Sequence, residues 1–188
     1  MMRLLSCLIA AFIALSATLS SSPARAEPIT DPENTLIMQL KTGRVVIAMR
    51  PDLAPHTVMR VKQLVRQGFY DGTPFHRVIE GMMVQGGDPT GSGMGGSGFK
   101  LQQEFSAEPH VRGTVSMARA SGFDSADSQF FICLSDIHKW DGKYTVWGKV
   151  IDGMEFVDEI KRGDEAKDGI VAGPDRIVWM KVASDVKQ

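Results

Sequence analysis

The chain has 188 residues, of which 43% are hydrophobic and 23% charged, and it carries 21 basic and 22 acidic side chains. This size and balance predict one soluble globular domain with a sizeable core and exclude two full domains. Because basic residues do not outnumber acidic ones, we expect no nucleic-acid partner.

Residues 1–26 have the layout of a secretory signal peptide. Arg3 precedes an apolar stretch at 4–19, and the sequence ARA at 24–26 matches a cleavage site. The apolar stretch is shorter than the about 20 residues of a membrane-spanning helix, so an uncleaved anchor is the weaker alternative. We expect export to the periplasm, a mature chain that begins at Glu27, and no stable membrane association after cleavage.

Cleavage would also change the charge and the cysteine content. It removes Arg3 and Arg25 and no acid, so 19 basic and 22 acidic residues remain, a net charge of −3. Cys7 leaves as well, and Cys133 alone can form no internal disulfide. Because Cys133 lies in the apolar run 130–134, we expect a buried and unreactive thiol.

Residues 27–34 contain two prolines and no periodic pattern, which predicts a flexible lead-in to a domain at 35–183 and a C-terminal tail at 184–188. A β-hairpin follows, with strands at 36–40 and 45–49. Residues 54–67 place apolar side chains at helical spacing, with Pro55 in the first turn and Gly68 as a C-terminal cap.

The rest of the chain is rich in strand-like runs. They lie at 75–79, 82–85, 114–118, 130–134, 144–150 and 176–182, and a second, short helix is predicted at 154–161. The connections are too short for repeated βαβ units, which favours an antiparallel barrel or sandwich whose open ends are covered by the two helices.

Residues 86–98 form a glycine-rich segment in which seven of 13 residues are glycine. The sequence at 91–96 satisfies G-x-G-x-x-G, but no helix start follows, so we interpret it as a mobile surface loop rather than a dinucleotide site. The histidines are not spaced as metal ligands, and Asp124 and Asp127 fit solvated loop carboxylates. We expect no cofactor and no metal.

Arg77 stands out within the run 75–79. Strand alternation places it on one side with Phe75 and Ile79, opposite His76 and Val78. A guanidinium on an apolar side of a strand needs a partner, because a buried unpaired charge is costly. Gln85 on the next predicted strand could supply that partner.

Five short motifs occur in an order that resembles the cyclophilin-type peptidyl-prolyl cis-trans isomerases. They are FHRVI at 75–79, QGG at 85–87, SMA at 116–118, SQFFI at 128–132 and GKV at 148–150. The resemblance runs from about residue 36 to 182. It implies a mainly β fold, a closed eight-stranded antiparallel β-barrel capped by two α-helices, and isomerisation of X-Pro bonds in proline-containing polypeptides. We expect the protein to be a monomer.

The resemblance also implies the site. Arg77 matches the family's catalytic arginine, with Gln85 and Phe131 beside it in the catalytic group. The implied substrate-binding residues are Phe75, Met82, Met83, Ala118, Arg119, Ala120, Gln129, Trp140 and Tyr144. The backbone at Arg119 would hydrogen-bond the peptide, and Ala120 would line the adjoining pocket.

Three positions depart from the family pattern. Met82 replaces the usual phenylalanine, Tyr144 replaces a frequent histidine, and Lys139-Trp140 alters a Trp-Leu pair associated with cyclosporin contact. These changes put cyclosporin binding in doubt and leave open an alternative function, a non-catalytic chaperone that binds proline-containing segments. We favour an isomerase that assists the folding of exported proteins, because Arg77 and Gln85 are both present.

Overall fold

The computed structural model describes residues 29–186, so the predicted signal peptide lies outside the described residues. Residues Pro32–Asn34 form a 3-10 turn, η1. The Glu33 carboxylate lies 2.5 Å from Lys62 Nζ and 3.0 Å from Arg66 Nη2. Ion pairs therefore link the described part of the predicted lead-in to helix residues of the folded domain.

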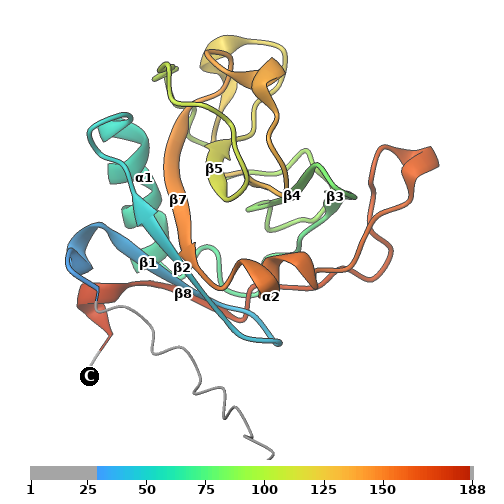
Figure 1. Ribbon diagram of the computed structural model, residues 1–188, viewed down its shortest axis with the longest axis horizontal. Coiled ribbons are helices and arrows are strands. Elements are labelled where there is room, and N and C mark those ends of the chain that lie inside the picture. Colours follow the sequence, from blue (N-terminus) through green and yellow to red (C-terminus); the bar gives the residue numbers. More distant parts are fainter. Residues whose placement is uncertain (1–28, 187–188) are drawn as a thin grey trace, which may run out of the picture.

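Within residues 29–186, eight strands form one antiparallel sheet (Figure 1). In chain order they are β1 (Thr35–Gln39), β2 (Arg44–Met49), β3 (Arg77–Ile79), β4 (Met83–Gly86), β5 (Thr114–Met117), β6 (Phe130–Cys133), β7 (Val146–Asp152) and β8 (Trp179–Val182). The predicted hairpin and the six other strands are confirmed, with ends that differ by at most three residues.

The prediction of a closed barrel is wrong. The strand order is β3-β4-β6-β5-β7-β2-β1-β8, and the sheet is an open half-barrel whose two edge strands, β3 and β8, do not pair. The outer edge of β3 is occupied instead by residues 163–171, because Val78 N donates to Gly169 O at 2.8 Å and Gly163 N donates to Val78 O at 3.1 Å. The irregular segments 72–75 and 175–177 run side by side between the strands β3 and β8, for example with Phe75 N donating to Asp175 O at 2.9 Å.

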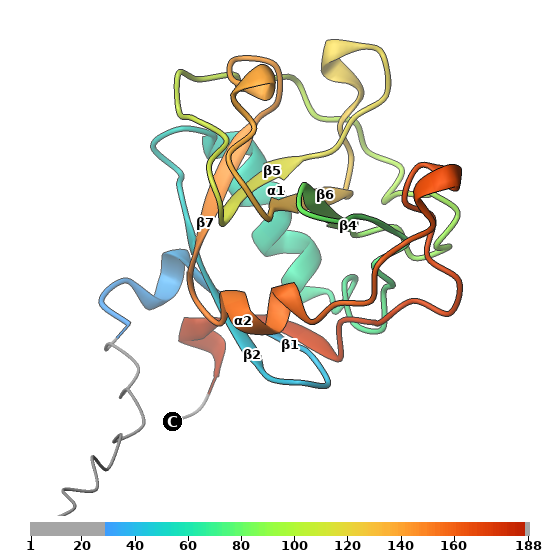
Figure 2. The ribbon, with the colours of Figure 1, turned by 45° about the vertical axis from the view of Figure 1, so that its right-hand side comes forward.

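In the part of the chain that the structure describes, two α-helices pack against the sheet. Helix α1 (Pro55–Arg66) contacts β8, and α2 (Met154–Asp158) contacts β2; Figure 2 shows α1 behind β5 and β7, with α2 at the lower end of the strands. Both were predicted, although α2 ends three residues early. Gly68 adopts φ 69° just beyond α1, a conformation that glycine reaches without steric cost.

The N-terminus of α1 receives its cap from a distant residue. Ala54, which precedes the helix, has no side chain that could cap it. The Glu104 carboxylate accepts from His56 N at 3.0 Å and from Thr57 N at 2.8 Å, and it also accepts from the Thr57 hydroxyl at 2.7 Å. These bonds satisfy amide groups that have no partner within the helix. Over residues 29–186, no helix combines the length and apolar character needed to cross a membrane.

The apolar residues divide into two clusters. The large cluster contains the buried faces of the sheet and of both helices, and Val78, Val84 and Ile132 belong to it. The small cluster contains Met83 and Phe131. Since neighbouring residues of a strand point to opposite faces, the small cluster lies on the other face of the sheet. That face carries the candidate site.

Candidate active site

Strand register places four of the residues on this outer face in one row. Arg77 of β3 pairs with Gln85 of β4, Gln85 pairs with Phe131 of β6, and Phe131 pairs with Ser116 of β5. Directly opposed residues of antiparallel strands project to the same face of a sheet. The fold therefore brings the predicted catalytic group of Arg77, Gln85 and Phe131 together.

A chain of hydrogen bonds orients the polar side chains of this row. Arg77 Nη1 donates to Gln85 Oε1 at 3.2 Å, and Gln85 Nε2 donates to Gln129 Oε1 at 2.9 Å. Gln129 Nε2 donates to the carbonyl oxygens of Gly93 at 2.9 Å and Gly95 at 2.8 Å. Because carbonyl groups only accept, they fix the direction of both amides and leave the Gln85 oxygen to face the guanidinium.

Apolar side chains on the same face form a cluster next to Arg77 and Gln85, which we call the cup. The cluster consists of Met83, Phe131, Cys133 and Ile137, with Ile79, Met82, Ala118, Trp140 and Tyr144 partly buried around them. The Phe131 ring centroid lies 5.0 Å from that of Trp140 and 5.4 Å from that of Tyr144, both in edge-to-face geometry. Six predicted site residues thus meet here, and Trp140 fills part of the cup wall.

Other predicted site residues lie at the rim. Ala120 is exposed, and Ala118 N donates to Gln129 O at 2.9 Å. The Arg119 guanidinium lies 4.9 Å from the Tyr144 ring centroid, and its Nη2 donates to Lys143 O at 3.0 Å. The Arg119 side chain therefore packs against Tyr144 and stabilises its position in the cup.

Phe75 does not fit its predicted role as a groove residue. Its side chain is 0% exposed and packs in the large cluster with Val78, so it presents no surface to a peptide. The expectation that Phe75 and Arg77 share a face is wrong because β3 begins only at Arg77, and the regular alternation does not extend back through Pro74.

The glycine-rich segment is organised by two buried carboxylates. Asp88 is 0% exposed and accepts from the backbone N–H groups of Thr90, Gly93 and Gly95. Asp127 is 7% exposed and accepts from Ser97 N at 2.7 Å, so it is not the solvated loop carboxylate that the sequence predicted. Hydrogen bonds lower the pKa of both carboxyl groups, against the opposing effect of burial.

A buried Ser-His-Asp chain lies beneath the cup. Ser116 Oγ is 2.9 Å from His110 Nε2, and His110 Nδ1 is 3.1 Å from Asp141 Oδ1. Ser116 and His110 are both 0% exposed, and Phe131 stacks on the imidazole with a centroid distance of 6.0 Å. Burial lowers the pKa of His110, which favours the neutral ring. No substrate carbonyl could reach the hydroxyl, so this chain supports Phe131 and does not form a hydrolytic site.

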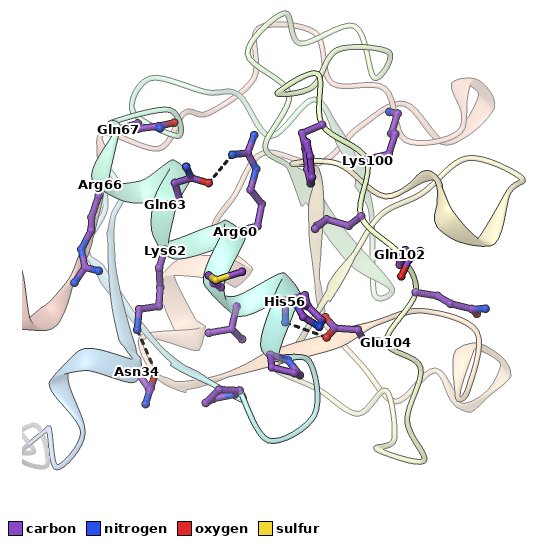
Figure 3. Close-up of a pocket in the computed structure, with 17 residues that line it drawn as sticks. Asn34, His56, Arg60, Lys62, Gln63, Arg66, Gln67, Lys100, Gln102 and Glu104 are labelled. Carbon is purple, nitrogen blue, oxygen red and sulfur yellow. Dashed lines mark hydrogen bonds between the residues drawn. The ribbon is translucent and has the colours of Figure 1, made fainter.

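A groove lies on another part of the surface. It measures about 1460 Å³ and runs between α1 and residues 99–104, lined by His56, Arg60, Lys100 and Glu104 among others (Figure 3). Arg60 donates to Gln63 there, and Glu104 faces the start of the helix. No predicted site residue lines this groove.

Comparison with known proteins identifies the family. The model for "Cyclophilin type peptidyl-prolyl cis-trans isomerase/CLD" matches residues 35–182. The chain belongs to the cyclophilin-type peptidyl-prolyl cis-trans isomerases. This cyclophilin is 47% identical to a "Probable peptidyl-prolyl cis-trans isomerase" of Brucella suis over 95% of both chains. It is 42% identical to peptidyl-prolyl cis-trans isomerase B of Bacillus subtilis, over 70% of this chain and 92% of the relative.

Solved cyclophilin structures share the fold. The cyclophilin AquaCyp293 of Hirschia baltica superposes with a TM-score of 0.74 at 26% identity, covering 84% of this chain and 76% of its own. A Cryptosporidium parvum cyclophilin determined in the presence of the dipeptide Ala-Pro gives a TM-score of 0.72 at 29% identity, covering 79% and 98%. This cyclophilin is thus an enzyme that isomerises X-Pro peptide bonds.

Sequence reasoning missed several residues around the cup. His110 and Asp141 gave no signal, because His110 contacts Ser116 and Asp141 contacts His110 only after the chain has folded. Asp88 could have been noticed, since an aspartate two residues before Thr90 often accepts from that backbone N–H. Asp168 carries no local signal, yet its carboxylate lies 2.8 Å from Arg77 Nη2.

Proposed function

We propose that Arg77 is the catalytic group of this isomerase and that the Phe131 cup holds the proline of the substrate. The observation that supports this proposal most strongly is the row in which Arg77, Gln85 and Phe131 pair across three strands. It sets a cation beside the apolar cluster around Phe131. A proline ring would contact that cluster because both are apolar, and the adjoining amide nitrogen would then lie near the guanidinium.

The chemical task is to ease rotation about a conjugated bond. Amide resonance gives a barrier of about 18–20 kcal/mol, and uncatalysed X-Pro rotation takes tens to hundreds of seconds. At the twisted transition state the proline nitrogen regains its lone pair and can accept a hydrogen bond. A donor at that position stabilises the transition state more than either planar isomer, which is what catalysis requires.

Arg77 retains donors for this step. A guanidinium carries five N–H groups. Within residues 29–186 its Nε bonds to Asp168 O, Nη1 bonds to Gln85 and Nη2 bonds to the Asp168 carboxylate. One N–H on each Nη nitrogen remains for the substrate. Lowering the barrier by about 7 kcal/mol would speed rotation roughly 10⁵-fold.

The remaining rim residues would hold the peptide on one side of the proline while the other side rotates. Gln85 and the backbone at Arg119 supply hydrogen-bonding groups, and Ala118 and Ala120 leave room for the chain. Met82, which is only partly buried, offers a flexible contact to the ring, since the thioether side chain adapts to irregular shapes, and the buried Met83 packs in the same cluster as Phe131. Proline-containing polypeptides are the substrates that this arrangement fits.

The test is peptide isomerisation in a proline-isomer-coupled assay. Arg77→Ala should reduce turnover by about 10²-fold, the effect of losing one oriented donor. Arg77→Lys should also be poor, because an ammonium group cannot donate to Gln85, Asp168 and substrate in the geometry of the planar fork. Arg44→Ala, an exposed position on β2, is the matched control and should retain full turnover. Undiminished turnover of Arg77→Ala would refute the assignment.

We also propose that the enzyme acts on exported proteins in the periplasm. The support is the signal-like composition of residues 1–26. N-terminal sequencing of the protein purified from an envelope fraction should give Glu27 as the first residue. Recovery of the intact chain in the cytoplasmic fraction would refute export.

A further inference from the structure

One carboxylate contacts Arg77 from outside the row of site residues. Asp168 Oδ1 lies 2.8 Å from Arg77 Nη2, and the Asp168 carbonyl oxygen accepts from Arg77 Nε at 2.9 Å. Asp168 thus binds the edge of the guanidinium formed by Nε and Nη2. Gln85 binds Nη1, on the side of the cup. The three hydrogen bonds, two to Asp168 and one to Gln85, fix the plane of the Arg77 guanidinium.

The segment that carries Asp168 is itself fixed to the sheet. Residues 163–171 run along the outer edge of β3, where the red-orange loop stands in Figure 1. Val78 N donates to Gly169 O at 2.8 Å, and Val171 N donates to His76 O at 3.0 Å. A Cβ on Gly169 would lie 2.8 Å from Ile79 Cγ1, so the backbone approaches β3 more closely than a residue with a Cβ would allow. The position of Asp168 relative to Arg77 is therefore set by β-type hydrogen bonds on both sides of it.

Asp168 also has an unusual backbone. Its φ is 53°, and within residues 29–186 it is the one non-glycine residue with positive φ. This conformation is uncommon for side chains with a Cβ, but asparagine and aspartate tolerate it best. It turns the Asp168 carbonyl and carboxylate toward the same guanidinium, so that one residue supplies two acceptors.

We infer that Asp168 is a positioning residue that holds the Arg77 guanidinium in its catalytic orientation. The inference rests on the proposed role of Arg77. An arginine side chain has several rotatable bonds, and a donor that is already oriented need not be ordered during the reaction. Asp168 is 78% exposed and the Arg77 side chain 30% exposed, so solvent weakens the pair and the contribution to overall stability should be small.

Two variants of Asp168 test its effect on the orientation of Arg77 without straining the backbone at residue 168. Asp168→Gly removes the side chain and accepts the positive φ without strain. Asp168→Asn keeps an oxygen acceptor and tolerates the same φ, but lacks the charge. Glu165→Gln, an exposed residue of the same loop, removes one charge without touching Arg77 and is the control.

We expect Asp168→Gly to lower kcat about two- to fivefold, the range of an exposed ion pair. Asp168→Asn should recover part of this loss, and Glu165→Gln should match the wild type. KM and the melting temperature should stay unchanged in all three, because the pair neither forms the cup nor belongs to the core. The Arg77 Nε–Hε signal in a ¹⁵N NMR spectrum should broaden or shift in Asp168→Gly and stay in place in Glu165→Gln.

Wild-type kcat in Asp168→Gly would overturn the inference, and so would a fall in kcat that is matched by the Glu165→Gln control. The same assay includes Arg77→Ala. If that variant stays fully active, the proposed role of Arg77 fails. If it loses activity while both Asp168 variants keep theirs, only the role of Asp168 fails.

Discussion

On the outer face of the sheet, the polar side chains of the site are oriented by hydrogen bonds to residues that are distant in the sequence. Gln129 fixes Gln85, and Gln85 together with Asp168 fixes Arg77. The pairing of Arg77 with Gln85 could be predicted because both lie in short strand-like runs close together. The contact with Asp168 could not, since it spans 91 residues and follows an irregular loop.

At the same scale, the Cys133 thiol should be chemically silent in the folded enzyme. Cys133 is 0% exposed in the small cluster, and burial raises the pKa of its thiol to about 12. Since the thiolate is the reactive form, almost none is present near neutral pH. A disulfide reagent such as DTNB should label no thiol in the native mature protein and one thiol in urea. Rapid labelling of the native protein would contradict the predicted burial.

Local sequence predicts a helix or strand correctly where its apolar spacing or turn residues are clear. Apolar spacing predicts α1, and Gly68 marks its end. The N-terminal cap of α1 is different, because Glu104 comes from a loop that no local rule connects to the helix. Strand β7 begins at Val146, two residues later than predicted, and the Tyr144 ring before it contacts Phe131 and Trp140.

The N-terminal cap that Glu104 supplies should contribute to the stability of helix α1. Glu104→Ala should lower the free energy of unfolding by about 1–2 kcal/mol, the cost of losing an N-terminal cap. Glu104→Gln should cost less, since its amide oxygen can still accept. Gln102→Ala, an exposed position in the same segment, is the control. Urea unfolding measures all three, and equal stability of Glu104→Ala and wild type would contradict the capping role.

For the whole molecule, the sequence predicted an antiparallel fold of eight strands and two helices but not the opening between β3 and β8. The opening depends on how residues 72–75 and 163–177 run along the sheet edges, and those segments show no periodic pattern. Ion pairs to helix α1 link the two ends of the described chain. Glu33 and Asp185, from opposite ends of the described chain, both contact Arg66.

These ion pairs make stability depend on pH. Hydrogen bonds from Lys62, Ser184 and Arg66 lower the pKa of Glu33 from 4.5 to about 2. The unfolded chain therefore binds a proton that the folded protein does not bind between these values, and stability decreases as the pH falls from 4.5 toward 2. The bonds from His110 and His138 also lower the pKa of Asp141 to about 2, which adds to the same trend.

Urea unfolding at about pH 6 and about pH 3 would measure this loss. Glu33→Gln should be less stable than wild type at the higher pH and closer to it at the lower pH. Added salt should reduce the difference, because Glu33 is exposed and its ion pairs are screened. A wild-type stability that stays constant between the two pH values would contradict the assignment.

The central claim is that Arg77 stabilises the twisted peptide bond and contributes little to holding the planar one. NMR exchange spectroscopy on an Ala-Pro-containing peptide measures both quantities, because cis–trans cross-peaks report turnover and chemical-shift titration reports the dissociation constant. For Arg77→Ala we predict loss of the enzyme-catalysed cross-peaks with a dissociation constant within about threefold of wild type. Cross-peaks that persist at the wild-type rate, or a loss of binding that accounts for the whole loss of exchange, would contradict the claim.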